Sequence, residues 1–326
     1  MPRLRECPDI IAPMLIKRLL QSLTRAGEGG TRTAPNALKR EAEHLTGFNW
    51  LVRGRHGIYL ASDNDVYIGR ALIHYGEYSE LEWRVLERYC RSGDTAVEVG
   101  ANIGAHTVSL AKAVGPSGRV VAIEPQPIIF QMLCANVALN CLLHVETLNC
   151  ACGSGEGMMG ALRLDYEAQG NFGGFSLQGP NESAPSTPVI VKRLDDLLRG
   201  SGRLDLIKID VEGMEADVLT GAAGVIERFR PTVYVENERL DKSRALIEAF
   251  WDMDYRLWWH APPLFNPDNY YANERNLYPR IGTFNMLCLH RSKAAEPPQE
   301  LDEVTDAGWH PHPLARTKSS SRRDER

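Results

Sequence analysis

Two short apolar segments, each followed or ended by a carboxylate, constrain this chain more than any other feature. The first spans 96–99, contains Glu98 and leads into a glycine-containing turn at 100–104, and the second spans 120–124 and ends in Glu124. Both are rich in β-branched and small apolar residues, and the stretch between them has the periodicity of a helix. This order predicts a strand, a helix and a parallel strand, the unit with which many α/β proteins bind a nucleoside.

The turn differs from a dinucleotide-binding turn. Such a site uses Gly-x-Gly-x-x-Gly so that bare backbone can approach a pyrophosphate, but counting from Gly100 the second and third glycine positions hold Asn102 and Ala105. Glu98 would also direct negative charge toward a phosphate. S-adenosylmethionine has a sulfonium, an α-ammonium group and no phosphate, so this turn favours it, with Glu124 accepting hydrogen bonds from the ribose hydroxyls. The cofactor-binding residues predicted here are Glu98, Gly100, Ala101, Asn102, Gly104, Glu124 and Pro125.

Strands and helices alternate after this unit, as in a doubly wound α/β domain. The strands are expected at 96–99, 120–124, 144–149, 204–209, 232–236, 255–259 and 284–289. The helices are expected near 105–114, 127–139, 213–228 and 242–253. No long helix fits between the last two strands, so the seventh strand is expected to return antiparallel beside the sixth. The prediction is a Rossmann-like, mostly parallel seven-stranded sheet with an antiparallel last strand.

The remaining segments complete the domain organisation. Residues 1–37 are expected to form an N-terminal helix and linker, and residues 38–92 a hairpin and helix that pack on the core at 93–290. The hairpin is expected over 57–68, around a turn at 63–65, and a loop or irregular hairpin over 153–188. Beyond 290 the chain is rich in Pro, Glu, Ser and Arg, which predicts a disordered tail over 291–326.

Composition excludes several classes of protein. The 326 residues carry a formal charge of −5, which gives no electrostatic case for a nucleic-acid partner. Seven scattered cysteines without a CxxC pair predict reduced thiols in a cytoplasmic protein. No apolar run approaches the ~20 residues of a membrane span.

The chain resembles the FkbM family of S-adenosylmethionine-dependent methyltransferases over roughly 57–290. The resemblance rests on Gly93-Asp94-Thr95-Ala96-Val97-Glu98-Val99-Gly100-Ala101-Asn102-Ile103-Gly104, on Glu124-Pro125 with Asn136 and Asn140, on Leu194-Asp195-Asp196-Leu197-Leu198, and on Ile207-Lys208-Ile209-Asp210-Val211-Glu212-Gly213-Met214-Glu215. Glu98 stands where the family commonly has Asp, and its longer arm can reach the same ligand. The resemblance implies a class I methyltransferase fold and O-methylation, often of a sugar or polyketide hydroxyl.

Carboxylates at the strand ends are the candidates for chemistry, because an alcohol needs a base or a metal before it attacks a methyl group. Asp210 ends the fourth strand, where it would act in catalysis and in cofactor positioning, and Glu212 follows it. A helix cap accounts for one acid there without any catalytic role. Glu236 follows the fifth strand, and His260 after the sixth is a second candidate base.

A metal is the alternative to a base. Asp210, Glu236 and Asn237 resemble the Asp and Asp-Asn set with which catechol-type O-methyltransferases hold Mg²⁺. The aromatic segment from Trp258 to Tyr271 suits stacking on a sugar, although a packed core is the favoured explanation for at least one of its tryptophans.

The sequence therefore predicts an S-adenosylmethionine-dependent O-methyltransferase with a small-molecule or glycan acceptor. Two alternatives stay open. One is a catalytically silent binding module that keeps the cofactor fold, and the other is an NAD-dependent oxidoreductase, which the glycine spacing disfavours.

Overall fold

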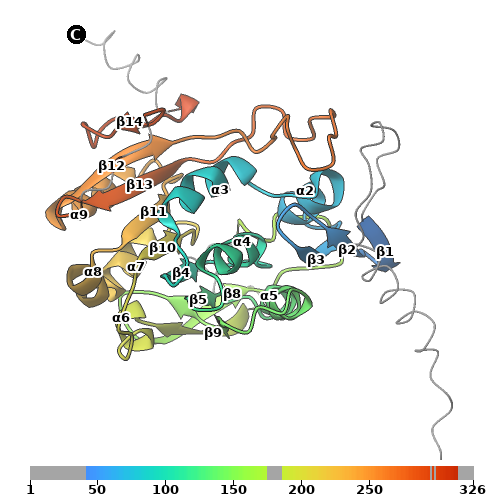
Figure 1. Cartoon of the computed structure of the whole chain (residues 1–326), viewed down its shortest axis with the longest axis horizontal. Helices are drawn as coiled ribbons and strands as arrows, with labels where there is room; N and C mark the ends of the chain where they lie inside the picture. Colours follow the sequence, from blue (N-terminus) through green and yellow to red (C-terminus); the bar gives the residue numbers. More distant parts are fainter. Residues whose placement is uncertain (1–41, 175–185, 294–295, 297–298, 315–326) are drawn as a thin grey trace, which may run out of the picture. The chain divides into compact units, whose positions relative to one another are not determined.

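A central eight-stranded sheet organises this α/β chain (Figure 1). The structure is a computed structural model that describes residues 42–174, 186–293, 296 and 299–314, so the helix and linker predicted over 1–37 lie outside the described residues. The strands of the central sheet are β4 (Thr95–Val99), β5 (Arg119–Ile123), β6 (Val145–Leu148), β10 (Leu206–Ile209), β11 (Thr232–Glu236), β12 (Tyr255–His260), β13 (Asn285–His290) and β14 (Asp302–Glu303). The helices around it are α2 (Ile68–Tyr75), α3 (Glu80–Leu86), α4 (Ala105–Val114), α5 (Pro127–Leu139), α6 (Leu194–Leu197), α7 (Glu215–Gly221), α8 (Ala223–Phe229) and α9 (Ser243–Asp252), with a short 3₁₀ helix, η2 (Glu87–Tyr89).

The strand order confirms the predicted doubly wound sheet. The order is β14-β12-β13-β11-β10-β4-β5-β6. Neighbouring strands from β6 to β11 are parallel, and β13 runs antiparallel between β11 and β12. The expected antiparallel return of the seventh strand is therefore confirmed, and the carboxyl ends of β4, β5, β10 and β11 meet at one edge of the sheet.

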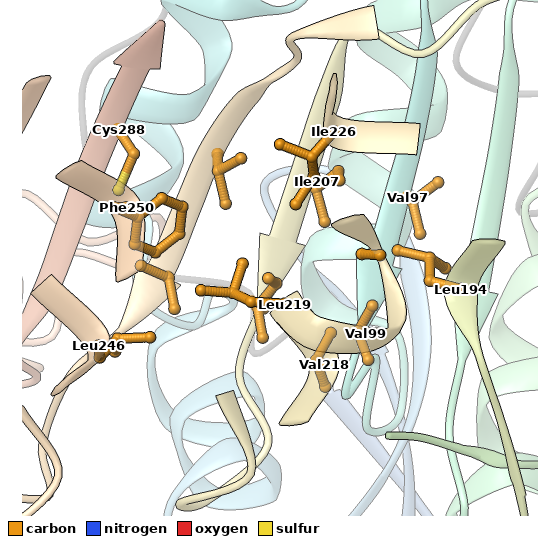
Figure 2. Packing of buried hydrophobic residues seen from close by; sticks show 14 of the residues in the cluster. Val97, Val99, Leu194, Ile207, Val218, Leu219, Ile226, Leu246, Phe250 and Cys288 are labelled. Carbon is orange, nitrogen blue, oxygen red and sulfur yellow. The ribbon is translucent and has the colours of Figure 1, made fainter. Parts of the chain in front are cut away.

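One face of the sheet carries the largest hydrophobic cluster. Figure 2 shows Val97, Ile207 and Cys288 of the strands packing against side chains of α7, α8 and α9. The helical partners labelled there are Val218, Leu219, Ile226, Leu246 and Phe250. Successive side chains of a strand point to opposite faces, so the residues between these apolar positions lie on the other face.

The opposite face changes from apolar to charged along each strand. Ala96, Leu206 and Tyr234 belong to its hydrophobic cluster, and two residues further along the same strands come Glu98, Lys208 and Glu236. Glu98 pairs in register with Lys208, and Lys208 pairs with Tyr234. Charged groups therefore gather at the carboxyl end of this face, which α3 and α4 cover (Figure 1).

The N-terminal segment differs from the expectation. Strand β3 (Ile58–Ser62) is a strand as predicted, but its partner is the preceding β2 (Asn49–Arg53), which pairs in turn with β1 (Ala42–Thr46). The turn at 63–65 leads into α2 and not into a second strand. Asp65 accepts backbone hydrogen bonds from Tyr67 and Gly69, so it holds the start of that helix.

A three-stranded sheet forms part of the region predicted as a loop or irregular hairpin. It contains β7 (Ala151–Cys152), β8 (Gly157–Leu162) and β9 (Ser186–Lys192), in the order β7-β9-β8. Strands β8 and β9 pair antiparallel, and residues 175–185 between them lie outside the described residues. The hairpin interpretation is confirmed for these strands.

The predicted disorder beyond residue 290 is wrong for residues 299–314. Strand β14 pairs with β12, and Val304, Ala307 and His310 are buried. The ring of His310 contacts that of Trp259 at a centroid distance of 4.7 Å. Isolated apolar and aromatic residues, without any periodicity, are enough to hold this segment on the sheet edge. Among the described residues, none of the helices is long and apolar enough to cross a membrane.

We expect a chain that ends at residue 298 to melt several degrees below one that ends at residue 314. The shorter chain loses Val304 and Ala307 and uncovers Trp259, a loss of apolar burial worth about 2–4 kcal/mol. Thermal denaturation followed by circular dichroism measures the difference. Equal melting temperatures would show that the segment contributes nothing to stability.

Candidate active site

A cavity opens where the charged strand ends meet. Its walls come from the turn after β4, the residues after β5, the segment around β7, the ends of β10 and β11, and side chains of α2, α3 and the 264–285 segment. All of the predicted cofactor residues except Gly104 line it, together with Asp210, Glu212 and Glu236. The sequence prediction that these residues share one site agrees with this geometry.

The glycine turn is held by backbone contacts on both sides. Gly100 has φ of +85°, and a Cβ there would lie 1.8 Å from the carbonyl oxygen of Asp210, so only glycine fits. Asn102 also has positive φ, at 49°. Its backbone N–H donates to Glu124 Oε2 at 2.9 Å, so the turn and the end of β5 are fixed to each other.

Glu124 is buried and presents its carboxylate to the cavity. Its Oε1 accepts a second backbone hydrogen bond, from Gln126 at 2.8 Å. Burial raises its pKa to about 7, although the two N–H groups oppose that rise. A carboxylate has about four acceptor positions, so the remaining lone pairs are available to hydroxyl donors.

Lys208 and Glu98 form the charged centre of the site. Lys208 is 2% exposed and donates to Asp210 Oδ2 at 2.9 Å. Burial disfavours its charge, but Asp210, Glu98 and Glu82 outweigh burial and raise the pKa of Lys208. Glu98 accepts a hydrogen bond from Thr107 Oγ1 at 2.6 Å, and burial raises its pKa to about 7.

Asp210 differs from the other acids of the cavity because it stays ionised. Desolvation acts against its charge, but the ammonium of Lys208 outweighs desolvation and holds the pKa of Asp210 below its usual range. Its side chain keeps 36% of its surface exposed. It therefore presents a permanent negative charge beside the glycine turn.

Three further carboxylates form a cluster next to Asp210. Oxygens of Glu212, Glu236 and Glu238 lie within 4.8 Å of one another. Burial and the neighbouring acids, Asp210 first among them, raise the pKa of Glu212 to about 7 and that of Glu236 well above its usual value. Such a set either holds protons at neutral pH or holds a cation, and its hard oxygen ligands suit Mg²⁺ or Ca²⁺.

The structure separates Asn237 from its predicted metal partners. Neighbouring residues of an extended segment face opposite sides, and Nδ2 of Asn237 donates to Met286 Sδ at 3.3 Å on the apolar face. Asp210 and Glu236 do share the cavity. The trio Asp210, Glu236 and Asn237 therefore does not form a metal site, and Glu212 and Glu238 lie near Glu236 instead.

His260 also lies outside the cavity. It ends β12, which β13 separates from β11, and its Nδ1 is 2.7 Å from Tyr234 Oη. Burial lowers its pKa to about 4. The two tryptophans that begin the aromatic segment belong to the core, since Trp258 and Trp259 are 4% and 5% exposed and neither lines the cavity.

Sequence reasoning missed three groups that the structure brings to the site. Lys208 is a lysine within an apolar strand, a signal that could have identified it. His106, in the first turn of α4, also lines the cavity. Glu82 of α3 accepts a hydrogen bond from Thr283 Oγ1 at 2.6 Å and faces Lys208, a placement that only tertiary packing creates.

A doubly wound sheet with a cavity at the carboxyl ends of its strands is the architecture in which many α/β proteins bind nucleotide ligands. The family model of the methyltransferase FkbM domain matches residues 98–257. Methyltransferase sdnD of Sordaria araneosa is 32% identical over 186 residues, which cover 47% of this chain and 70% of that protein. Methyltransferase 1 of Beauveria bassiana is 29% identical over 143 residues, which cover 38% of this chain and 57% of that protein.

Solved structures match less closely. The FkbM methyltransferase of Methylobacillus flagellatus is 18% identical, with a TM-score of 0.39 and coverage of 70% of this chain and 55% of that one. The O-methyltransferase TomG of Streptomyces achromogenes is 16% identical, with a TM-score of 0.39 and coverage of 65% and 80%. From the sequence matches, this chain belongs to the FkbM methyltransferase family.

The raised pKa of Glu98 makes the stability of the ligand-free protein depend on pH. A buried carboxyl with a folded-state pKa near 7 and an unfolded value near 4.5 favours the folded state while protonated, so stability falls as the pH rises between these values. Glu98→Gln removes this titration and keeps an acceptor for Thr107. We expect the variant to gain on the order of 2 kcal/mol relative to wild type between pH 5 and pH 8. Urea unfolding at both pH values measures this, and a constant difference would contradict the assignment.

Proposed function

We propose that this protein is an S-adenosylmethionine-dependent O-methyltransferase that acts on a hydroxyl of a small molecule or glycan. The observation that carries the proposal is the shared cavity. Glu124 lines it after β5, where it can accept hydrogen bonds from ribose hydroxyls, and the carboxylates after β10 and β11 line it beyond the intervening strand β4. Backbone hydrogen bonds already fix the Glu124 carboxylate in place, so binding costs little reorganisation.

The donor set of the cavity fits S-adenosylmethionine. The cofactor brings an electrophilic methyl group on a cationic sulfonium. The cavity offers carboxylates to that positive charge, and Lys208 is the one lysine or arginine that lines it among the described residues. A pyrophosphate would meet Glu98, Glu124 and Asp210 instead, which disfavours a dinucleotide and hence the oxidoreductase alternative.

Glu236 is the proposed base. A hydroxyl must lose its proton as its oxygen attacks the methyl carbon, and a carboxylate with a raised pKa accepts that proton more readily than an ordinary one, once a cationic ligand has displaced the carboxyl's own proton. The pKa of Glu236 is raised by burial and by its acidic neighbours, whereas Asp210 stays ionised beside Lys208. Asp210 would then compensate positive charge in the cavity while Glu236 takes the proton.

A metal-assisted form of the same reaction is the second candidate. The cluster of Glu212, Glu236 and Glu238 favours it, since three carboxylates at this separation can share one divalent cation. In that case the ion would lower the pKa of the acceptor hydroxyl. The two forms share every cofactor contact and differ in the role of Glu238.

We expect Glu124→Ala to weaken S-adenosylmethionine binding about 10- to 100-fold, because it removes charge-assisted hydrogen bonds to the ribose. Isothermal titration calorimetry measures the affinity. Glu146→Ala is a matched control, since Glu146 lies on the neighbouring strand β6 and pairs with Arg119 outside the cavity. Equal affinity in both variants would refute the assignment of Glu124.

A second experiment separates the base from the metal. We expect Glu236→Gln to lower kcat by ~10²–10⁴, while Glu238→Gln and EDTA leave turnover within a few-fold of wild type. Release of S-adenosylhomocysteine is measured with a panel of sugar and polyketide alcohols as acceptors. Loss of activity in EDTA that Mg²⁺ restores, together with loss in Glu238→Gln, would overturn the base in favour of the metal.

A further inference from the structure

His106 carries a buried ring nitrogen that lacks a hydrogen-bond partner. The residue lies in the first turn of α4, is 4% exposed and lines the cavity. Its Nε2 finds no hydrogen-bond partner within the described part of the chain. Most buried polar atoms are paired, so an unpaired nitrogen on a cavity wall indicates a group that a ligand supplies.

The contacts of the ring show what Nε2 can do. The ring also interacts with the backbone of Ser79, and since Nε2 has no partner, that hydrogen bond belongs to Nδ1. A hydrogen bond from Nδ1–H to a carbonyl leaves Nε2 as a bare lone pair. Burial, with Lys208 as the next cause, lowers the pKa of His106 to about 3, so the ring stays neutral at physiological pH.

The charges near His106 are of both signs. Lys208 and Asp210 are the charged groups that affect it most. Glu124 follows β5 and Asp210 follows β10, and β4 lies between these two strands in the sheet. The cavity therefore has a ribose side at Glu124 and a second side where a neutral acceptor, an ammonium and a carboxylate lie near one another. A zwitterion is the ligand group that such a set fits.

We propose that Nε2 of His106 accepts a hydrogen bond from the α-ammonium group of the methyl donor, with Asp210 as the opposite charge. This proposal rests on the function proposed above, because it assigns the amino-acid end of S-adenosylmethionine to the side of the cavity opposite Glu124. The carboxylate of the ligand then faces Lys208. His106 is thus a cofactor-binding residue and takes no proton in the reaction.

Two ligands that differ in the amino-acid end test this assignment. S-adenosylhomocysteine carries that end, and 5′-methylthioadenosine keeps the adenosine and lacks it. We expect His106→Leu to weaken S-adenosylhomocysteine about 10- to 100-fold and to leave 5′-methylthioadenosine within about two-fold of wild type. His106→Gln, which can place an amide oxygen near the position of Nε2, is expected to recover most of the loss.

Calorimetry with both ligands at pH 6 and pH 8 gives four affinities for each protein. Because the ring of His106 is neutral, we expect the same loss of affinity at both pH values. Unchanged binding of 5′-methylthioadenosine shows that the leucine variant is folded. Equal losses for both ligands, or none for either, would overturn the role of His106. If wild type binds neither S-adenosylmethionine nor S-adenosylhomocysteine, the proposed function itself fails, so the two failures are distinguishable.

Discussion

The ammonium of Lys208 is the interaction on which the site depends. It is buried at the centre of the sheet, and Glu98, Asp210 and Glu82 face it from β4, from the end of its own strand and from α3. A lone buried ammonium would be costly, so these three acids and the lysine require one another. The charged centre therefore connects the glycine turn, the strand ends and an N-terminal helix that covers the sheet.

Around this centre the carboxylates exceed the cations. Asp210 is ionised because it contacts Lys208, whereas burial and mutual repulsion raise the pKa values of Glu98, Glu124, Glu212 and Glu236. In the ligand-free protein, protons bound to these carboxyl groups neutralise the excess negative charge. A cationic ligand replaces those protons and relieves the repulsion, so binding and the ionisation of these acids are coupled. The electrostatic field of the cavity thus favours a positively charged ligand, whatever the shape of that ligand.

The sequence predicted the sheet well because its signals are local. Apolar runs such as 96–99 and 119–123 and the glycine turn identify strands and their carboxyl ends, and parallel topology then gathers Glu98, Glu124 and Asp210 without further information. Asn237 was predicted wrongly because adjacency in sequence places it on the opposite face from Glu236. His106 was missed because its surroundings come from packing against Tyr78 and Ser79, just before α3, which no local pattern encodes. The ordered segment 299–314 was missed for the same reason, since single buried residues such as Val304 leave no periodicity.

The two walls of the cavity have different origins in the chain. The FkbM match spans 98–257 and contains Glu98, Glu124, Asp210 and Glu236. The wall that faces them includes Tyr67, Tyr78 and Glu82 before the matched region and Leu264, Ile281 and Thr283 after it. These two flanking segments pack on each other in one cluster, where Tyr78 and Leu264 both take part. The residues proposed to bind the methyl donor and to remove the proton therefore lie within the FkbM match, whereas much of the wall that would face an acceptor lies outside it. Of the flanking residues, Glu82 alone is among the acids that act most on Lys208. Substitutions elsewhere in that wall would change the shape of the cavity and leave the Lys208 centre intact, so two proteins with the proposed reaction could accept different hydroxyls.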